Sequence, residues 1–185
     1  IRMNKHVETI LQAAHMDKEE LELHLVPLHL HDMIKGGMDN HQLQLKEKNG
    51  QVILHLNADN DVIEADEIHF SNLISNLIDN ARVHSGGRPT VHVQLADEDE
   101  PIGNIWIVVE DNGEGLIDGE SEKIFERFSR GAAAGKRFGQ EGAGLGLALA
   151  LEHITLHGGR IWAENRQDGI VGARFIVEIA IEVPA

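Results

Sequence analysis

Hydrophobic and polar positions follow a helical period between Ser71 and Ser85. Apolar side chains recur at intervals of three and four residues, which predicts a helix with one stripe facing a core: Leu73, Ile74, Leu77, Ile78 and Ala81. A second set recurs every fourth residue on a neighbouring face: Asn72, Asn76, Asn80 and His84. Asparagine is a mediocre helix former because its amide competes with the backbone. This face is therefore either a solvated surface or a set of amide oxygens used as ligands, suited to magnesium bound to phosphates.

Other periodic segments complete the secondary structure. Alternating apolar and polar residues predict strands over 21–27, 51–57, 61–65, 90–95, 105–110, 160–165 and 173–182. Helical periods predict helices over 1–20, 28–49, 121–130 and 144–157. Asn49–Gly50 predicts a turn. Asp66 is expected to be the N-terminal acidic residue of the asparagine-bearing helix, and Gly158–Gly159 should end the last helix.

Strands outnumber helices, and hairpin connections dominate. This pattern predicts an α+β fold, a two-layer α/β sandwich with a mixed, mostly antiparallel sheet and helices on one face. An N-terminal helix over 1–20 precedes the sandwich, and its narrow apolar stripe indicates half of a helical hairpin or an oligomer seam. Residues 111–146 are rich in glycine and charge, so we expect most of this stretch to be a long binding loop or lid.

The composition narrows the function classes. The 185 residues suffice for one domain with a sizeable core, and only 4% are aromatic, so this core must be mainly aliphatic. A formal net charge of −15 argues against nucleic acid as a partner. The lack of cysteine excludes disulfides, thiolate metal sites and cysteine nucleophiles. No apolar run approaches the ~20 residues that span a bilayer. Because the chain starts at Ile1 without a methionine, we expect a fragment of a longer protein.

Two glycine motifs border the expected loop. DNGEG begins at Asp111 directly after a predicted strand, so its carboxylate could accept a hydrogen bond from a ligand amine beside a flat ring. The alternative is a simple turn, for which Asp-Asn-Gly is well suited. EGAGLGLALA places Gly142, Gly144 and Gly146 at the start of a helix, where backbone N–H groups can bind phosphates. It is neither a P-loop nor a dinucleotide fingerprint, and the alternative is close packing of the helix start.

Basic residues gather between the two glycine motifs. Five of the 16 lysines and arginines fall within this segment: Lys123, Arg127, Arg130, Lys136 and Arg137. In an acidic protein they supply local positive charge for an anion such as a triphosphate, with a solvated loop as the alternative. Phe125 and Phe128 are expected to pin the lid to the domain.

A metal site can be imagined near the N-terminus. His29, His31 and Asp32 have a spacing that suits one face of a strand. Because no further cluster completes the ligand set, we do not expect zinc or another transition metal there.

The order of these motifs resembles the catalytic domain of sensor histidine kinases, in the GHKL (Bergerat-fold) superfamily. NLIDNA resembles the N box, DNGEG the first glycine box, IFERF the F box and GAGLGL the second glycine box. HGGRIWAEN and GARFIVEI resemble the closing strands, so the resemblance covers about residues 21–182. It implies a two-component histidine kinase that binds Mg-ATP and transfers the γ-phosphoryl group to a histidine on an upstream helical domain, with a response regulator as a further partner. It also implies a cytoplasmic domain whose parent is a homodimer associated with the inner membrane.

The resemblance assigns roles by position. Asn80 would coordinate magnesium and Asn76 would support the phosphates or the metal, both as catalytic residues. Asp111 would bind the adenine amine in a pocket shaped by two glycines. The complete set of implied nucleotide contacts is Asn76, Asn80, His84, Asp111, Gly113, Gly115, Arg130, Lys136, Arg137, Gly142, Gly144, Leu145 and Gly146. ATP-hydrolysing relatives carry a glutamate at the position of Asn76. An amide cannot accept a proton from water, which favours phosphotransfer over hydrolysis.

Some features depart from the family pattern. Val83 stands where a lysine or arginine is usual, and Arg82 lies one step round the helix, so a phosphate contact is expected from the lid instead. The phosphoacceptor motif is absent, since His6 lacks its context. Residues 1–20 resemble the end of the dimerisation and phosphotransfer hairpin, followed by an ATP-binding domain over 21–185 with a lid at about 116–143. Two alternatives are a gyrase-like or chaperone-like ATPase module and a degenerate domain that binds nucleotide or a partner without transferring phosphate.

Overall fold

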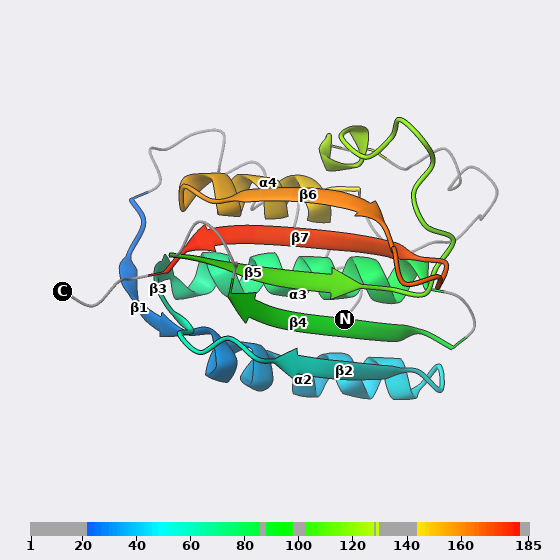
Figure 1. The fold of residues 1–185 in the computed structure, drawn as a ribbon, viewed down its shortest axis with the longest axis horizontal. Helices are drawn as coiled ribbons and strands as arrows, with labels where there is room; N and C mark the ends of the chain where they lie inside the picture. Colours follow the sequence, from blue (N-terminus) through cyan, green and yellow to red (C-terminus); the bar gives the residue numbers. More distant parts are fainter. Residues whose placement is uncertain (1–21, 86–87, 98–102, 128, 130–143, 182–185) are drawn as a thin grey trace.

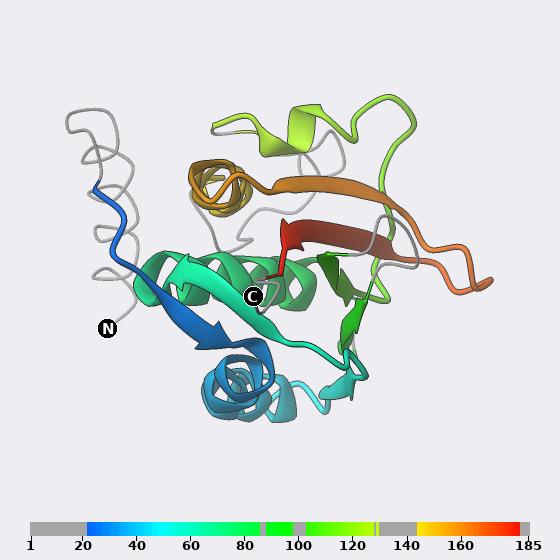
Figure 2. The same cartoon turned by 60° about the vertical axis from the view of Figure 1, so that its left-hand side comes forward.

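A five-stranded sheet and the helices packed on one of its faces form two layers (Figure 1, Figure 2). The computed structural model describes residues 22–85, 88–97, 103–127, 129 and 144–181. The described helices are α2 (Leu30–Lys46), α3 (Glu67–His84) and α4 (Gly146–Leu156). The strands are β1 (Leu25–His29), β2 (Gln51–Leu56), β3 (Val62–Asp66), β4 (Thr90–Asp97), β5 (Asn104–Glu110), β6 (Arg160–Asn165) and β7 (Ala173–Ala180). The helix predicted over 1–20 lies outside the described residues.

The large sheet has the strand order β2-β4-β5-β7-β6. β2 and β4 are parallel, while the other neighbouring pairs are antiparallel. The predicted α+β sandwich, with a mixed and mostly antiparallel sheet, is therefore confirmed. The strands predicted from residue 51 onward are also confirmed, with ends that differ by about one or two residues.

Alternation along the strands separates the two faces of the sheet. The face toward the helices buries aliphatic side chains such as Val93, Ile107, Val109 and Val177, which join the core of α2, α3 and α4. None of the described helices combines the length and apolar character needed to cross a bilayer.

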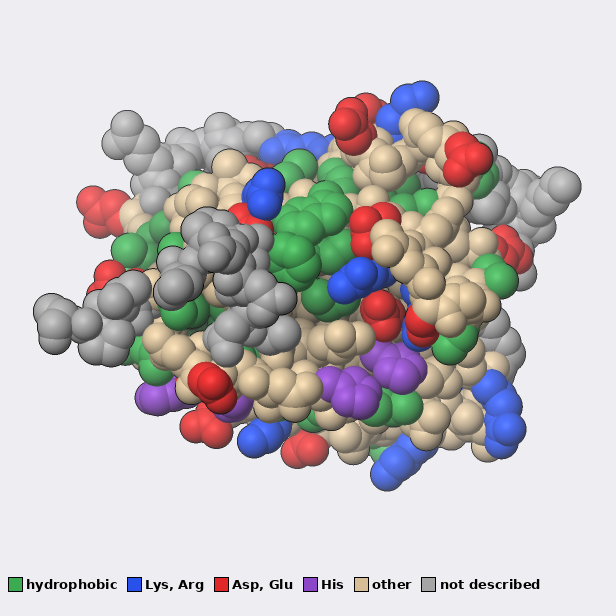
Figure 3. All heavy atoms as spheres, viewed as in Figure 1, with side chains coloured by type: hydrophobic (Ala, Val, Ile, Leu, Met, Phe, Trp, Pro, Cys, Tyr) green, Lys and Arg blue, Asp and Glu red, His purple; other side chains and the backbone are tan. Residues whose placement is uncertain are grey.

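The opposite face carries an apolar centre bordered by charged side chains (Figure 3). Trp106 and Trp162 meet edge to face, with ring centroids 5.8 Å apart. The indole of Trp106 donates to Glu178 (3.0 Å), and Arg160 lies over the ring of Trp162 while it also pairs with Glu178. These contacts cover apolar surface that the helices do not reach.

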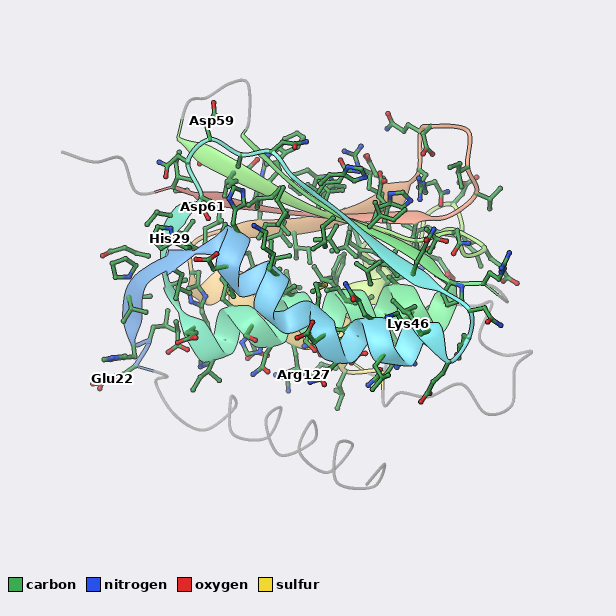
Figure 4. All side chains as sticks on the ribbon, turned by 90° about the horizontal axis from the view of Figure 1, so that it is seen from below. Glu22, His29, Lys46, Asp59, Asp61 and Arg127 are labelled. Atoms are coloured by element: carbon green, nitrogen blue, oxygen red, sulfur yellow. The ribbon has the colours of Figure 1, made fainter. Side chains whose placement is uncertain are left out.

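β1 and β3 form a separate two-stranded antiparallel sheet beside the first turns of α2 and α3. The strand predicted over 21–27 was misplaced, because β1 starts at Leu25 and ends at His29. It continues past Pro27 because a proline is tolerated in an edge strand. His31 lies in the first turn of α2, within the helix predicted over 28–49, so His29 and His31 do not share the strand face that their spacing would suit. His29 and His31 both approach Asp61, at 3.4 and 3.5 Å. Figure 4 shows His29 and Asp61 beside the N-terminal end of α2. Across the described residues, no three His, Asp or Glu side chains group as metal ligands.

α3 forms where its apolar stripe predicted. The side chains of its stripe are buried in the core: Phe70, Leu73, Ile74, Leu77, Ile78 and Ala81. Asp66 caps the helix, because its Oδ1 accepts from the amides of Ile68 and His69, each at 3.1 Å, and its Oδ2 accepts from the amide of His24 at 3.0 Å. Burial alone would raise the pKa of Asp66, but these amides hold the pKa below its ordinary value. The predicted N-terminal acidic residue is thus confirmed.

The first part of the predicted lid differs from the prediction. The helix predicted over 121–130 is reduced, within the described residues, to a single 3₁₀ turn at Lys123–Phe125. Glu126 then turns to extended backbone (φ −69°, ψ 145°). Phe125 is buried against Phe175 of β7, with ring centroids 6.5 Å apart, while Phe128 lies outside the described residues. A single apolar anchor is enough to fix a short turn without extending a helix.

Three histidines connect α3 to α4. His69 Nδ1 lies 2.9 Å from His153 Nδ1, and His157 Nδ1 donates to the carbonyl of His153 at 2.6 Å. The amide of Asp66 donates to His157 Nε2 at 3.0 Å, so this ring accepts at one nitrogen and must be neutral. Burial, reinforced by the neighbouring His69 and His157, lowers the pKa of His153 to about 4.

The stability of the domain should therefore fall on acidification. The depressed pKa of His153 means that the unfolded chain binds a proton below pH 6.5, whereas the folded chain resists it down to about pH 4. The free energy of unfolding is expected to decrease by about 3 kcal/mol across this interval. Urea denaturation at a series of pH values measures the change. His153→Leu should be flatter in the same window, and an equal slope in both proteins would contradict the assignment.

Candidate functional site

Three segments distant in sequence meet at one end of α3. Ser85, directly after α3, forms an isolated antiparallel bridge with Gly113 in the loop after β5. The approach is so close that a Cβ on Gly113 would lie 2.4 Å from the carbonyl oxygen of His84. On the next helix, the Cβ position of Gly146 is 3.7 Å from Asn76 Oδ1. The end of α3, the loop after β5 and the start of α4 therefore form one site.

The asparagine face of α3 is directed toward this site. Asn76 and Asn80 are half-buried, and His84 is exposed one turn further along. Because residues four apart lie above one another on a helix, Asn80 lies between Asn76, whose side chain is beside Gly146, and His84, whose carbonyl oxygen approaches Gly113. The structure thus brings these side chains to the same place as the two glycine motifs.

Asp111 is the most deeply buried carboxylate of the described residues, with an exposure of 1%. Its Oδ1 accepts from the amides of Gly113 (2.8 Å) and Ala173 (3.1 Å), and its own amide donates to the carbonyl of Ala173 (3.0 Å). Burial raises the pKa of Asp111, although the two amides act in the opposite direction. The side chain follows β5 on the parity of Ile107 and Val109, so it is directed toward the helical layer.

The loop after Asp111 is fixed by side chains from other strands. Asn112 accepts from the amide of Thr90 and donates to the carbonyl of Arg88, each at 3.0 Å. Asn165 holds Leu116 through both its amide oxygen (2.6 Å) and its amide nitrogen (3.1 Å). Gly115 has φ +77°, and a Cβ there would lie 2.6 Å from Asn165 Oδ1. This glycine is therefore required by the backbone as well as by the contact.

The N-cap position of α4 is held by a residue that cannot cap the helix with its side chain. Leu145 is buried and provides the N-cap position without a side-chain hydrogen bond. Gly144 before it has φ +69°, a conformation that favours glycine. The first N–H groups of a helix have no partner within the helix, and Leu145 offers no polar side chain to them, so this end suits an anion.

Only some of the basic residues predicted to bind phosphate lie among the described residues. Lys123 is exposed, and Arg127 pairs with Glu152 of α4 at 3.4 Å. Arg82 pairs with Asp79 on α3 itself, also at 3.4 Å. The remaining predicted site residues Arg130, Lys136, Arg137 and Gly142 lie outside the described residues.

A groove of about 300 Å³ opens elsewhere, between α2 and α3. It is lined by Met33, Gly37, Met38, Asn40, His41, Gln44, Ser71, Ile74 and Ser75. None of the predicted site residues lines it. We therefore place the functional site by its chemistry, at the end of α3, and not at this groove.

Sequence reasoning missed the residues behind Asp111. Arg166 Nη1 donates to the carbonyl of Asp111 at 3.1 Å, although its side chain comes from the β6–β7 hairpin. A Cβ on Gly172 would lie 2.0 Å from the same carbonyl oxygen. The only signal in the sequence was the resemblance of the closing strands, which assigned no role to the turn between them.

Replacing Gly172 should disturb the site through the backbone. In Gly172→Ala the new methyl collides with Asp111, and we expect a loss of about 1–3 kcal/mol in the free energy of unfolding. Gly36→Ala is the matched control, because nothing lies within 4 Å of its Cβ position in α2. That variant should gain about 0.5–1 kcal/mol from helix propensity. Chemical denaturation measures both, and wild-type stability of Gly172→Ala would refute the predicted clash.

Comparisons with known proteins agree with this geometry. Residues 65–183 match the family described as histidine kinase-, DNA gyrase B- and HSP90-like ATPase. The sensor protein RprX of Bacteroides fragilis is 32% identical over 180 residues, which cover 97% of this chain and 34% of RprX. The chain therefore spans about a third of the length of this curated relative.

Solved structures share the fold. Full-length ShkA in complex with AMPPNP has a TM-score of 0.80 at 22% identity, covering 97% of this chain and 36% of ShkA. Histidine kinase ThkA in complex with the response regulator protein TrrA has a TM-score of 0.78 at 22% identity, covering 97% of this chain and 48% of the ThkA chain. At this identity the likeness extends to the fold alone.

Proposed function

The chain belongs to the family of histidine kinase-, DNA gyrase B- and HSP90-like ATPases, and we propose that it is the ATP-binding catalytic domain of a two-component sensor histidine kinase. The observation that carries the proposal is the convergence of the asparagine face of α3, the buried Asp111 and the uncapped start of α4. The domain binds Mg-ATP and donates the γ-phosphoryl group to a histidine on a helical domain upstream. Its parent is a membrane-associated homodimer that passes the phosphoryl group to a response regulator.

Each part of the site suits one part of the nucleotide. The carboxylate of Asp111 accepts a hydrogen bond from the adenine amine, beside Gly113 and Gly115. The amides at the start of α4 hold phosphate oxygens beside Asn76, whose Oδ1 is 3.7 Å from the Cβ position of Gly146. His84 and Leu145 flank the same space. The lid, with Arg130, Lys136, Arg137 and Gly142, closes over the phosphates and supplies the charge that Val83 does not.

The amide oxygens of Asn76 and Asn80 suit magnesium. They are neutral, hard ligands on one helical face, and magnesium prefers oxygen ligands supplied together with substrate phosphates. The metal, when bound, neutralises charge on the phosphates. Asn80 is the proposed ligand, and Asn76 orients the phosphates from one turn earlier.

The side chain at position 76 favours transfer over hydrolysis. Activation of water requires a group that accepts its proton, and the amide of Asn76 cannot do so. The remaining contribution of the domain is positioning and electrostatic stabilisation of the γ-phosphoryl group. The acceptor histidine therefore has to come from another domain, of which residues 1–20 form the last part.

Asn80→Ala should weaken Mg-ATP binding at least about tenfold, because it removes a ligand of the metal. Asn72→Ala is the matched control, since this asparagine lies two turns earlier on the same helical face. Isothermal titration calorimetry with ATP and magnesium gives the affinities. With EDTA in place of magnesium, the difference between the two variants should shrink. Failure of the wild-type chain to bind at millimolar ATP would reject the proposed function.

Phosphotransfer distinguishes the proposed kinase from its two rivals. A protein extended by the upstream hairpin should form acid-labile phosphohistidine from γ-labelled ATP, with little release of free phosphate. An ATPase module would instead hydrolyse ATP steadily, and a degenerate domain would bind ATP and label no histidine. Asn76→Glu should raise the ratio of free phosphate to phosphohistidine, because a carboxylate can accept a proton from water.

A further inference from the structure

The β6–β7 hairpin carries a buried arginine, Arg166, that contacts the backbone of Asp111. The side chain of Arg166 is 3% exposed, and its guanidinium makes three different contacts. Nη1 donates to the carbonyl of Asp111 at 3.1 Å, Nε and Nη2 bind the carboxylate of Asp168, and Nη2 lies 3.6 Å from Glu110. A planar guanidinium can satisfy such a set because its donors have a fixed fork geometry.

The same hairpin contacts the amide, the carbonyl and one carboxylate oxygen of Asp111. Its amide and its Oδ1 both bond to the backbone of Ala173, and its carbonyl receives Arg166. The amide of Gly113 also ends on Oδ1, so Oδ2 is the oxygen that a ligand amine can engage. Gly172 separates the two parts of this arrangement, since its Cβ position is 2.0 Å from the carbonyl of Asp111 and 3.0 Å from Cδ of Arg166. The contacts from the β6–β7 hairpin to Asp111 thus help to orient its carboxylate.

We propose that Arg166 is a positioning residue that determines base specificity, by holding Asp111 so that its Oδ2 accepts a hydrogen bond from the exocyclic amine of adenine. The inference rests on the proposed nucleotide-binding function and adds a residue to it. Arg166 contacts Asp111 through the backbone carbonyl and not through the carboxylate, so it acts on the nucleotide only through Asp111.

Base selectivity reports this role. A carboxylate is an acceptor, so it pairs with an amine and not with the oxo group that hypoxanthine carries at the same ring position. A fixed acceptor therefore favours ATP over ITP. When the carboxylate is free to rotate, part of this preference is lost, while contacts to the phosphates and ribose, which both nucleotides share, are retained. A merely structural residue would weaken ATP and ITP equally.

Arg174 provides a matched control in the same sheet. It is also an arginine paired with Glu110 (3.4 Å), and its second partner is Glu164 (3.2 Å). Neither of these partners is Asp111. Arg174→Gln and Arg166→Gln remove the same charge beside Glu110, so they differ in the contact to Asp111.

The experiment compares magnesium-dependent ATP and ITP affinities by calorimetry in the full chain and its variants. The wild type should prefer ATP, Arg166→Gln should lower the ATP-to-ITP affinity ratio about tenfold, and Arg174→Gln should keep the ratio within about twofold. A tenfold change is the lower end of what one hydrogen bond to a charged group contributes. Equal ratios in the two variants, with ATP preferred by the wild type, would overturn the role of Arg166 and leave the proposed function intact.

Two further outcomes are decisive. If the wild-type chain binds neither nucleotide at millimolar concentration, the proposed function fails and the role of Arg166 with it. If thermal melting shows that Arg166→Gln is unfolded at the assay temperature, Arg166→Lys replaces it. Lysine keeps the charge and loses the fork, so its ATP-to-ITP ratio should fall about threefold. A wild-type ratio in Arg166→Lys would then refute the proposal.

Discussion

The antiparallel pairing of β5 with β7 fixes a buried carboxylate at the end of a strand, and the candidate site depends on that constraint. A carboxylate that loses water needs hydrogen bonds in exchange. Asp111 obtains them from the amides of Ala173 and Gly113, one across the sheet and one in its own loop. Because Glu110 and Arg174 are register partners in this pairing, a slip of one residue would remove the amide of Ala173 from Asp111.

The second constraint is the position of α3. Its apolar stripe is buried between the sheet and α4, and its first turn is capped by Asp66. These contacts hold the asparagine face at a fixed rotation, so functional side chains rest on a rigid element. Histidine contacts between α3 and α4 add a pH-dependent connection at the far end of the same helix pair. The contact between Asn76 and Gly146 thus lies away from His153, whose burial lowers its pKa.

In the proposed chemistry, the fold provides the nucleotide site, and single side chains decide which reaction and which base it favours. The family is described by histidine kinases together with DNA gyrase B- and HSP90-like ATPases, so one architecture serves more than one activity. Asn76 differs from a glutamate by one functional group, yet the exchange alters the ability to take a proton from water. In our proposal Arg166 influences the bound base indirectly. It holds the backbone carbonyl of Asp111 and so orients the carboxylate that accepts the hydrogen bond from the base.

Local pattern explains the parts of the molecule that were predicted correctly. Alternation located β2 to β7, helical spacing located α2, α3 and α4, and turn chemistry located Asn49–Gly50 and the cap at Asp66. It failed where local preference is weak, at β1 across Pro27 and at the short turn ending with Phe125.

The sequence by itself determined which residue types stand at the ends of these elements: an aspartate after β5, asparagines along α3 and glycines before α4. Only the tertiary structure decided that Ser85 meets Gly113, that Asn76 faces Gly146, and that Arg166 and Gly172 hold Asp111 from behind. Those contacts join segments separated by many residues. They depend on strand order and register, and no local period in the chain encodes them.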